Sequence, residues 1–384
     1  MKKEFIGFYD PTDEEIEKAW NDGIFAFDAN TLLNLYRYTD VTRKDFTHAL
    51  KSIKERLFIP SQVAYEYLNN RVGVIDGLEK SYFELEKVLK DNFDNNLKKS
   101  INAFKRHPSI VIETILEKYE DFLKKMSVEL EKQKKRHPDF KTKDNILNEL
   151  TELFESCIGK EPSKTEVVKI YAEGKERYAE EIPPGYKDLK EKEKKGSRNL
   201  YGDLLVWKEL IEFSKKNKKP LVFVTDDRKE DWWKIENGKT IRPREELIKE
   251  FYDITGIRIL IYNADQFLKF AKERGMIPTI KDETIEEVKE IRIYDEARNT
   301  NYHDMREFYR NWHNVGDNSR EVLNRLSNID NINKIMSNPF YDSAQTYKNV
   351  FNNFNNDSLW RIMNPVPKIK DKNNDLLNDD NESK

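Results

Sequence analysis

Residues 221–233 read LVFVTDDRKEDWW, and this stretch decides the fold. The apolar run from Leu221 to Thr225 predicts a short buried strand. Two carboxylates, Asp226 and Asp227, follow the run directly, and a charged turn with two tryptophans comes next. Because ligand sites in open α/β sheets lie at the carboxyl ends of the strands, we expect a functional site at this point.

A second apolar run, IFAF at residues 24–27, also ends in an acid, Asp28, and leads into a helix-like stretch. A third run, LFI at residues 57–59, is closed by Pro60, and Ser61 is a plausible N-cap for the helix that carries Glu66. The further elements expected are a helix at residues 42–53, a helix at 200–215, a helix at 244–251, a strand at 257–262 and a helix at 264–274. Strands that alternate with helices predict a parallel sheet with right-handed crossovers.

A long insertion separates the elements expected before residue 74 from those expected after residue 180. Residues 74–180 are rich in Lys and Glu and carry apolar residues at helical spacing, so we expect a mostly helical insertion. We assign residues 1–281 to one domain that includes this insertion. Residues 282–370 form a C-terminal region of unknown role, and residues 371–384 read as a disordered tail.

The composition limits the classes of protein that fit. The 384 residues are 36% charged with a net charge of −3, which does not suit a polycationic nucleic-acid coat. A single cysteine, Cys157, excludes an internal disulfide framework and a cysteine-based zinc site. Neither a signal peptide nor an apolar run of about 20 residues is evident, so we expect a cytoplasmic protein without a membrane span.

Acidic side chains are the candidates for chemistry. Asp28, Glu66 and Asp227 each lie at the end of a strand or on the helix after it, and Asp203 lies in the apolar setting GDLLVW. Carboxylates brought together repel one another unless a cation intervenes, and hard oxygen ligands select Mg²⁺ or Mn²⁺. Either Asp226 or Asp227 can be the ligand after the strand of residues 221–225. Taken singly, each acid is as well explained as a turn former or a helix cap.

Basic residues beside this site are candidates for contacts with phosphates. Residues 182–198 read IPPGYKDLKEKEKKGSR, a loop with an excess of basic side chains. We select Lys187, Lys190 and Arg198 from it, and Lys229 from the turn after Asp227, as nucleic-acid-binding residues. The alternative is an ordinary solvated loop in a chain rich in Lys and Glu.

Five blocks of the sequence resemble, in order, the motif blocks of bacterial PIN-like domain proteins. The blocks are FDANTLLNLY (27–36), PSQVAYEYLNNR (60–71), IPPGYKDLKEK (182–192), GDLLVWKELI (202–211) and VTDDRKEDWW (224–233). The resemblance spans roughly residues 25–270 and is interrupted by the helical insertion. The chain is longer than compact toxins of this kind, and its region after residue 282 matches nothing familiar.

The resemblance implies an α/β, three-layer PIN-like fold with a central parallel sheet, here with a long helical insertion and a C-terminal extension. It also implies phosphodiester cleavage that depends on Mg²⁺ or Mn²⁺, usually of RNA. By position, Asp28 matches the family's first-strand aspartate, Glu66 its helix glutamate, Asp203 its third acid and Asp227 its last. Asp28, Asp203, Asp226 and Asp227 are then the candidate metal ligands.

These arguments predict a metal-dependent nuclease, an endoribonuclease first, that serves as a toxin or phage-defence effector. A regulatory protein partner and an oligomer are compatible with this function. One alternative is an inactive PIN-fold scaffold that binds RNA or protein. Another is a phosphatase similar to haloacid dehalogenases, which is disfavoured because Asn30 and Trp207 stand where acids are expected.

Overall fold

The structure is a computed structural model that describes residues 1–293, except 193, 195, 237–238 and 278. All of these residues belong to one compact unit, Met1–Asn299. The rest of the predicted C-terminal region, residues 294–370, and the predicted tail, residues 371–384, lie outside the described residues. The proposed boundaries at residues 281 and 370 therefore stay predictions.

Helices dominate the described part of the chain. The α-helices are α1 (Asp13–Asp22), α2 (Ala29–Leu33), α3 (Asp40–Ser52), α4 (Ser61–Asn92), α5 (Lys98–Asn102), α6 (Ile112–Arg136), α7 (Asn145–Phe154), α8 (Lys164–Ala179), α9 (Leu189–Lys192), α10 (Ser197–Leu200), α11 (Gly202–Asn217), α12 (Glu245–Thr255) and α13 (Ala264–Glu273). The strands are β1 (Ile24–Phe27), β2 (Leu57–Phe58), β3 (Leu221–Val224), β4 (Trp233–Glu236), β5 (Lys239–Pro243) and β6 (Leu260–Tyr262).

Four strands form the predicted parallel sheet, in the order β2-β1-β3-β6. β1 lies between β2 and β3, and Phe27 pairs with Val224 at the carboxyl ends of two neighbouring strands. The Asp28 amide continues this pairing because it donates to the Val224 carbonyl over 2.8 Å. The register therefore sets the residues that follow β1 beside those that follow β3, as the sequence predicts.

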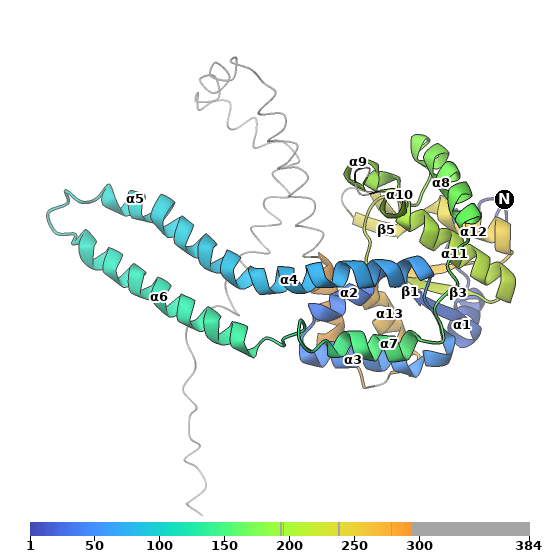
Figure 1. Ribbon diagram of the computed structural model, residues 1–384, viewed down its shortest axis with the longest axis horizontal. Coiled ribbons are helices and arrows are strands. Elements are labelled where there is room, and N and C mark those ends of the chain that lie inside the picture. The colour runs from blue at the N-terminus through green and yellow to red at the C-terminus, as the bar shows by residue number, and fades with distance from the viewer. Residues whose placement is uncertain (193, 195, 237–238, 278, 294–384) are drawn as a thin grey trace, which may run out of the picture. The chain divides into compact units, whose positions relative to one another are not determined.

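Helices cover both faces of the sheet, which confirms the three-layer fold (Figure 1). On one face, Phe25 and Phe27 of β1 both pack edge-on against Phe267 of α13, with ring centroids 5.8 and 5.1 Å apart. On the other face, Phe223 of β3 packs on Trp232, with ring centroids 5.4 Å apart. Every residue of β1 and β3 is buried, as expected for central strands of a parallel sheet.

One element was not expected, and one local prediction is wrong. The predicted charged turn after Asp227 is present at residues 230–232, but β4 and β5 follow it as a two-stranded antiparallel ribbon that the sequence did not predict. Ser61 is the first residue of α4 rather than its N-cap, which is Pro60. The carboxylate of Glu209 in α11 accepts from the Ser61 and Gln62 amides instead, so a distant side chain caps α4.

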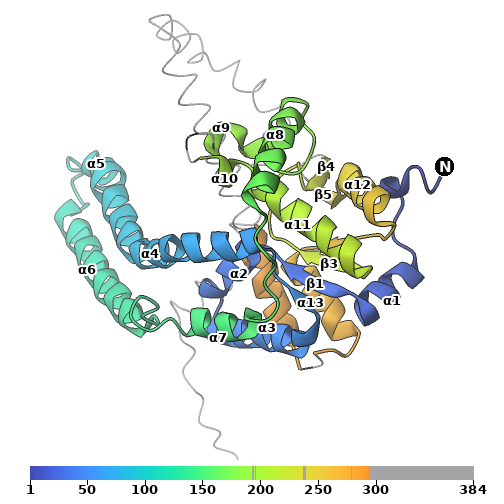
Figure 2. The same ribbon diagram turned by 45° about the vertical axis from the view of Figure 1, so that its right-hand side comes forward.

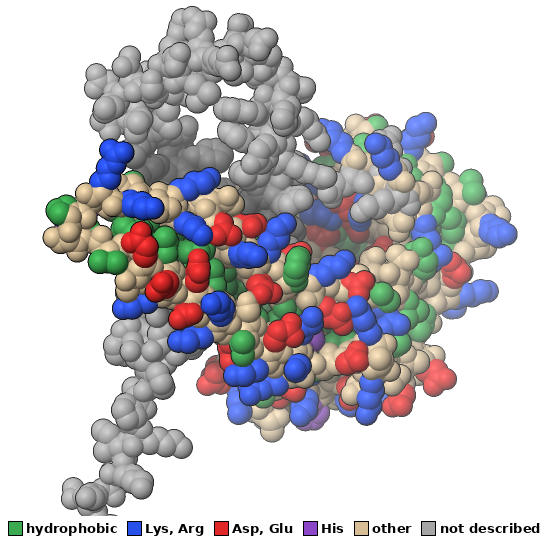
Figure 3. Space-filling view, turned by 60° about the vertical axis from the view of Figure 1, so that its left-hand side comes forward, with side chains coloured by type: hydrophobic (Ala, Val, Ile, Leu, Met, Phe, Trp, Pro, Cys, Tyr) green, Lys and Arg blue, Asp and Glu red, His purple; other side chains and the backbone are tan. Residues whose placement is uncertain are grey.

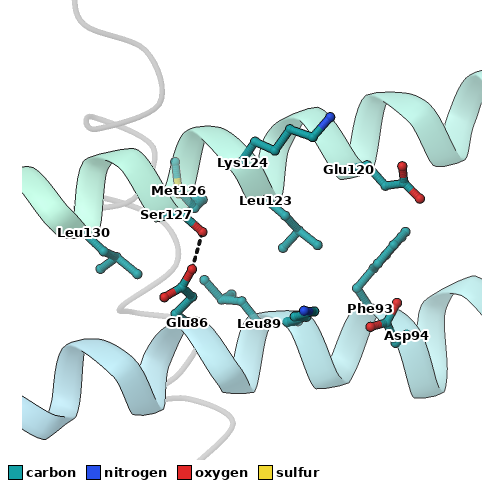
Figure 4. Close-up of a pocket in the computed structure, with 11 residues that line it drawn as sticks. Glu86, Leu89, Phe93, Asp94, Glu120, Leu123, Lys124, Met126, Ser127 and Leu130 are labelled. Atoms are coloured by element: carbon teal, nitrogen blue, oxygen red, sulfur yellow. Dashed lines mark hydrogen bonds between the residues drawn. The ribbon is translucent and has the colours of Figure 1, made fainter.

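The first part of the predicted insertion, residues 74–180, extends the helix that carries Glu66, and α7 and α8 form its last part. α4 continues without a break to Asn92 and pairs with α6 to form a helical arm, which we define as residues 74–136 (Figure 2). Phe93 stacks on Tyr119 across the arm. The Ser127 hydroxyl donates to Glu86 over 2.5 Å (Figure 4). A cavity of about 380 Å³ lies between the two helices, lined by leucines and charged residues but by none of the candidate acids.

The surface of the arm carries both signs of charge. Figure 3 shows lysines and arginines interspersed with acidic side chains along it. Mixed charges keep exposed helices solvated and do not by themselves indicate a binding partner. Within the described residues, no helix has the length and apolar character that a membrane crossing requires.

Residues 282–293 form a helix that packs on the sheet domain. The carboxylate of Glu287 accepts hydrogen bonds from the Thr39 amide and hydroxyl and from the Thr42 hydroxyl, over 2.6 to 2.8 Å. Arg292 pairs with Asp265 of α13 over 2.6 Å. The described start of the predicted C-terminal region thus belongs to the same compact unit as the sheet.

Candidate functional site

Asp28 lies where β1 ends and caps α2. One carboxylate oxygen accepts from the Ala29 amide over 2.7 Å, and the other accepts from the Thr225 hydroxyl over 3.0 Å. A residue after a strand that turns into a helix adopts extended backbone and can accept from the helix's free amides. The sequence therefore folds locally so that the Asp28 carboxylate stands at the carboxyl edge of the sheet.

Asp227 lies at the same edge, two residues after Thr225. Its amide donates to the Thr225 hydroxyl over 3.0 Å, and the same hydroxyl donates to Asp28. Thr225 thus links the acids that follow β1 and β3. Asp227 is buried, with 7% of its surface exposed, and the Trp233 indole donates to its carbonyl.

Asp226 points elsewhere. One of its carboxylate oxygens accepts from the Asn34 amide group over 3.0 Å, and the other accepts from the Ala264 backbone amide at the start of α13 over 3.1 Å. Burial raises the pKa of Asp226, and these two hydrogen bonds oppose the rise. The structure therefore brings Asp227, and not Asp226, together with Asp28.

Glu66 reaches the same region from α4. Its Oε1 accepts from Gln62 Nε2 over 2.7 Å, one turn earlier on the same helix face. A Cβ atom on Gly202 would lie 2.3 Å from Glu66 Oε1. Glycine at the start of α11 therefore allows the Glu66 carboxylate to lie against the backbone next to Asp203.

Asp203 is the acid with the least support from hydrogen bonds. Its Oδ2 is buried, and no hydrogen-bond partner reaches it among the described residues. A Cβ atom on Gly185 would lie 3.1 Å from the Asp203 Cβ, so the loop of residues 183–188 packs against it. A buried carboxylate oxygen without a partner is costly unless a cation or a proton satisfies it.

The electrostatics show that these four acids form one group. Burial, followed by the charges of Glu66, Asp227 and Asp203, raises the pKa of Asp28 to about 8. Burial and Asp203 raise the pKa of Glu66 to about 7. Burial also raises the pKa of Asp203, while Lys192 and Lys229 oppose the rise. We call Asp28, Glu66, Asp203 and Asp227 the acid cluster.

Two lysines counter the acid cluster. Lys229 Nζ lies 3.0 Å from Asp227 Oδ2 and 2.8 Å from Asp188 Oδ2, and Lys192 Nζ lies 2.5 Å from the same Asp188 oxygen. Burial opposes ionisation of Asp188, but Lys229 and Lys192 hold the pKa of Asp188 below its usual value. Lys229, selected from the sequence as a phosphate ligand, is thus tied to acids of the site.

The other predicted basic residues lie at the rim. Lys187 pairs with the exposed Glu230, and its backbone amide donates to Asp231 over 3.2 Å. Lys190 is exposed on α9. Arg198 Nε donates to Gln62 Oε1 over 2.9 Å. Gln62 in turn donates to Glu66, so a single side chain links Arg198 to the acid cluster. None of these contacts tests binding of a nucleic acid, which stays a prediction.

Sequence reasoning missed the groups that hold the site in shape. Asp231, fully buried, accepts from the Gly185 and Lys187 amides over 3.0 and 3.2 Å and so fixes the loop of residues 183–188. Burial, Asp203 and Asp227 raise the pKa of Asp231 to about 7. Asp188 was read only as part of a charged run. Its one sequence signal was its place inside the block IPPGYKDLKEK.

The donor set fits a hard divalent cation. The acid cluster supplies only oxygen ligands, repels itself, and includes the partnerless Asp203 oxygen. As the side chains stand, no three His, Cys, Asp or Glu residues in the described part of the chain are close enough together to hold a metal ion. Lys229 already pairs with Asp227. A divalent cation that binds Asp227 would therefore take the place of the Lys229 ammonium group.

The fold and this site define a class: a parallel α/β protein whose strand ends gather carboxylates into one crevice. The family model for the PIN-like domain matches residues 24–247, more than half of the chain, and the chain therefore belongs to the PIN-like domain family. Proteins of this family are generally nucleases and usually use divalent metals. Searches of curated proteins and of solved structures found no match.

Proposed function

We propose that this protein is a metal-dependent nuclease that hydrolyses phosphodiester bonds, with RNA as the first substrate to test. The observation that carries the proposal is the convergence of Asp28, Glu66, Asp203 and Asp227 on one edge of the sheet, close enough for each charge to affect Asp28. Acids used only as turn formers or helix caps have no reason to converge from four separate elements.

Each acid has a defined part in this proposal. Asp28, Asp203 and Asp227 would hold Mg²⁺ or Mn²⁺, and Glu66, steadied by Gln62, would bind the metal or orient a water molecule. The bound metal would lower the pKa of that water and stabilise charge on the phosphate. Asp226 is left out because Asn34 and Ala264 engage both of its oxygens.

The basic side chains would act on the substrate's phosphates. Lys229 and Lys192 stand inside the site, and Lys187, Lys190 and Arg198 stand at its rim. Positive charge close to the scissile phosphate stabilises the developing negative charge and fixes the register of the chain. Roles as a toxin or phage-defence effector and a regulatory partner rest on the family resemblance and stay predictions. The cytoplasmic location rests on the composition and the lack of a signal peptide, and it also stays a prediction.

Cleavage of labelled single-stranded RNA and DNA tests the proposal. Purified protein is incubated with each polymer in Mg²⁺, in Mn²⁺ and in EDTA, and compared with Asp28→Asn and Asp203→Asn. An exposed acid at the end of α1, Asp22, provides the matched control Asp22→Asn. We expect metal-dependent cleavage of RNA that both cluster variants lose by a factor of at least about 100 and the control keeps.

The same assay separates the alternatives. Binding of RNA without cleavage under all metal conditions would support a scaffold and overturn the nuclease. Release of phosphate from small monoesters, without cleavage of either polymer, would instead indicate a phosphatase.

A further inference from the structure

Next to the acid cluster, Arg198 stacks on Tyr65, a contact to which the proposed mechanism gives no role. The Arg198 guanidinium carbon lies 3.7 Å from the centroid of the Tyr65 ring. Arg198 belongs to α10 and Tyr65 to α4, so the stack joins elements far apart in the sequence. Both side chains are partly exposed, Arg198 by 35%. The pair therefore offers solvent a flat, positively charged surface.

This stack is connected to the acid cluster by two hydrogen bonds. Arg198 Nε donates to Gln62 Oε1 over 2.9 Å, and Gln62 Nε2 donates to Glu66 Oε1 over 2.7 Å. Gln62, Tyr65 and Glu66 are spaced three and four residues apart, so they share one face of α4. A nucleotide lying on the stack would be a direct neighbour of one bound at Glu66.

A second aromatic side chain borders the stack. Tyr171 of α8 is partly exposed and packs on Tyr201, with ring centroids 5.3 Å apart. Burial raises the pKa of Tyr171, and the nearby Arg198 opposes this rise. Arg198 also pairs with Glu161 over 2.9 Å, but that acid is 65% exposed, and exposed pairs hold a side chain only weakly.

We propose that Arg198 and Tyr65, bordered by Tyr171, form a nucleobase-binding subsite beside the acid cluster. The proposal rests on the proposed nuclease function, since it gives that site's substrate a second point of attachment. Bases stack on aromatic rings and on guanidinium planes, whatever their sequence. A base enclosed between its neighbours in a duplex cannot reach the stack, so the subsite favours a base that is unpaired or turned outward.

Binding without cleavage tests the subsite separately from the chemistry. The full chain carries Asp28→Asn to stop cleavage, and fluorescence anisotropy reports its affinity for a short single-stranded RNA. The RNA is used in two forms, with normal bases and with abasic sites, and 2-aminopurine in a third form reports stacking by fluorescence quenching. Tyr65→Leu removes the ring, Tyr65→Phe keeps it, and Tyr82→Leu on the arm part of α4 is the matched control.

We expect Tyr65→Leu to weaken binding of normal RNA about tenfold and to abolish the quenching, while Tyr65→Phe and Tyr82→Leu change neither. Binding of the abasic RNA should be the same with and without the Tyr65 ring. An equal loss for normal and abasic RNA, an unchanged affinity in Tyr65→Leu, or no binding of any RNA would each overturn the subsite. The cleavage assay with the wild-type chain tests the nuclease proposal separately, whichever of these binding results is found.

Discussion

Lys229 Nζ lies 3.0 Å from Asp227 Oδ2 and 2.8 Å from Asp188 Oδ2, so one lysine joins the acid cluster to the loop of residues 183–188. Burial works against its charge, but Asp227, Asp203 and Asp188 together raise the pKa of Lys229. The ammonium group is therefore a resident counterion of the acid cluster. A divalent cation that binds Asp227 must compete with it.

This competition predicts that Lys229→Met binds Mg²⁺ or Mn²⁺ more tightly than the wild-type protein. Removing one positive charge beside Asp227 should strengthen binding about tenfold, equivalent to ~1.4 kcal/mol. Isothermal titration calorimetry measures the affinity directly and needs no substrate. Lys216→Met, at an exposed position near the end of α11, is the control and should leave the affinity unchanged. A folded Lys229→Met protein with equal or weaker affinity would contradict the role of counterion.

The raised pKa of Asp28 predicts how stability depends on pH without a metal. In the folded protein Asp28 keeps its proton up to about pH 8, whereas in the unfolded chain it loses the proton near its ordinary value of 3.8. The folded state therefore binds more protons between these values, and the free energy of unfolding falls as pH rises through this window. Urea unfolding in EDTA at pH 5 and pH 8 should show lower stability at pH 8.

Asp28→Asn should reduce this pH dependence because an amide carries no charge at either pH. Glu212→Gln, at an exposed position on α11, should leave it unchanged. An Asp28→Asn protein that loses as much stability as the wild type between the two pH values would show that Asp28 is not the group responsible. Mn²⁺ should restore stability at pH 8, since it neutralises the charge that the folded state must otherwise bury.

Gly202→Ala should displace Glu66 without unfolding the protein. An added Cβ would lie 2.3 Å from Glu66 Oε1, and the contacted atom is the end of a flexible side chain that can move. A shift of a catalytic carboxylate by about 1 Å can lower activity about 100-fold. Cleavage and metal affinity should therefore fall, while the circular dichroism spectrum stays that of the wild type.

Gly73→Ala is the matched control for that substitution. Nothing lies within 4 Å of the Cβ it would add, and Gly73 is inside α4. Alanine should raise the stability of the helix by about 0.5–1 kcal/mol and leave cleavage unchanged. Equal activity in Gly202→Ala and Gly73→Ala would show that the close approach of Glu66 to α11 does not matter for function.

The parallel sheet and the positions of Asp28 and Asp227 could be predicted from the sequence because their signals are local. An apolar run that ends in an acid shows both the strand and its carboxyl end. Asp226 and Asp227 could not be told apart in this way. Their directions depend on Asn34 and on the Ala264 amide, which lie far away in the sequence and approach Asp226 only after folding.

Lys192 and Asp188, which support the cluster, were missed for the same reason. Lys192 and Asp188 lie in a run of alternating charges, where neither stands out from its neighbours. They become distinct when Lys229, 41 residues after Asp188, joins them at one buried carboxylate. Pair interactions across such a distance leave no periodic pattern in a single sequence.

The cap of α4 is another contact that no local pattern reveals, and it leads to the last prediction. The Glu209 carboxylate accepts from the Ser61 amide over 2.5 Å, from the Ser61 hydroxyl over 3.0 Å and from the Gln62 amide over 3.0 Å. Negative charge at a helix N-terminus is favourable because it meets the free amides and the positive end of the helix dipole. Glu209 therefore fixes the turn of α4 that leads to Glu66.

Glu209→Ala should lower the free energy of unfolding by about 1–3 kcal/mol, because it leaves two N-terminal amides of α4 without their partner. Glu209→Gln should lower it less, since the amide oxygen still accepts a hydrogen bond. Urea unfolding of both variants measures the difference, and Glu212→Gln, three residues later on the exposed side of α11, sets the baseline. If Glu209→Ala unfolds at the same urea concentration as that baseline, the cap does not stabilise the first turn of α4.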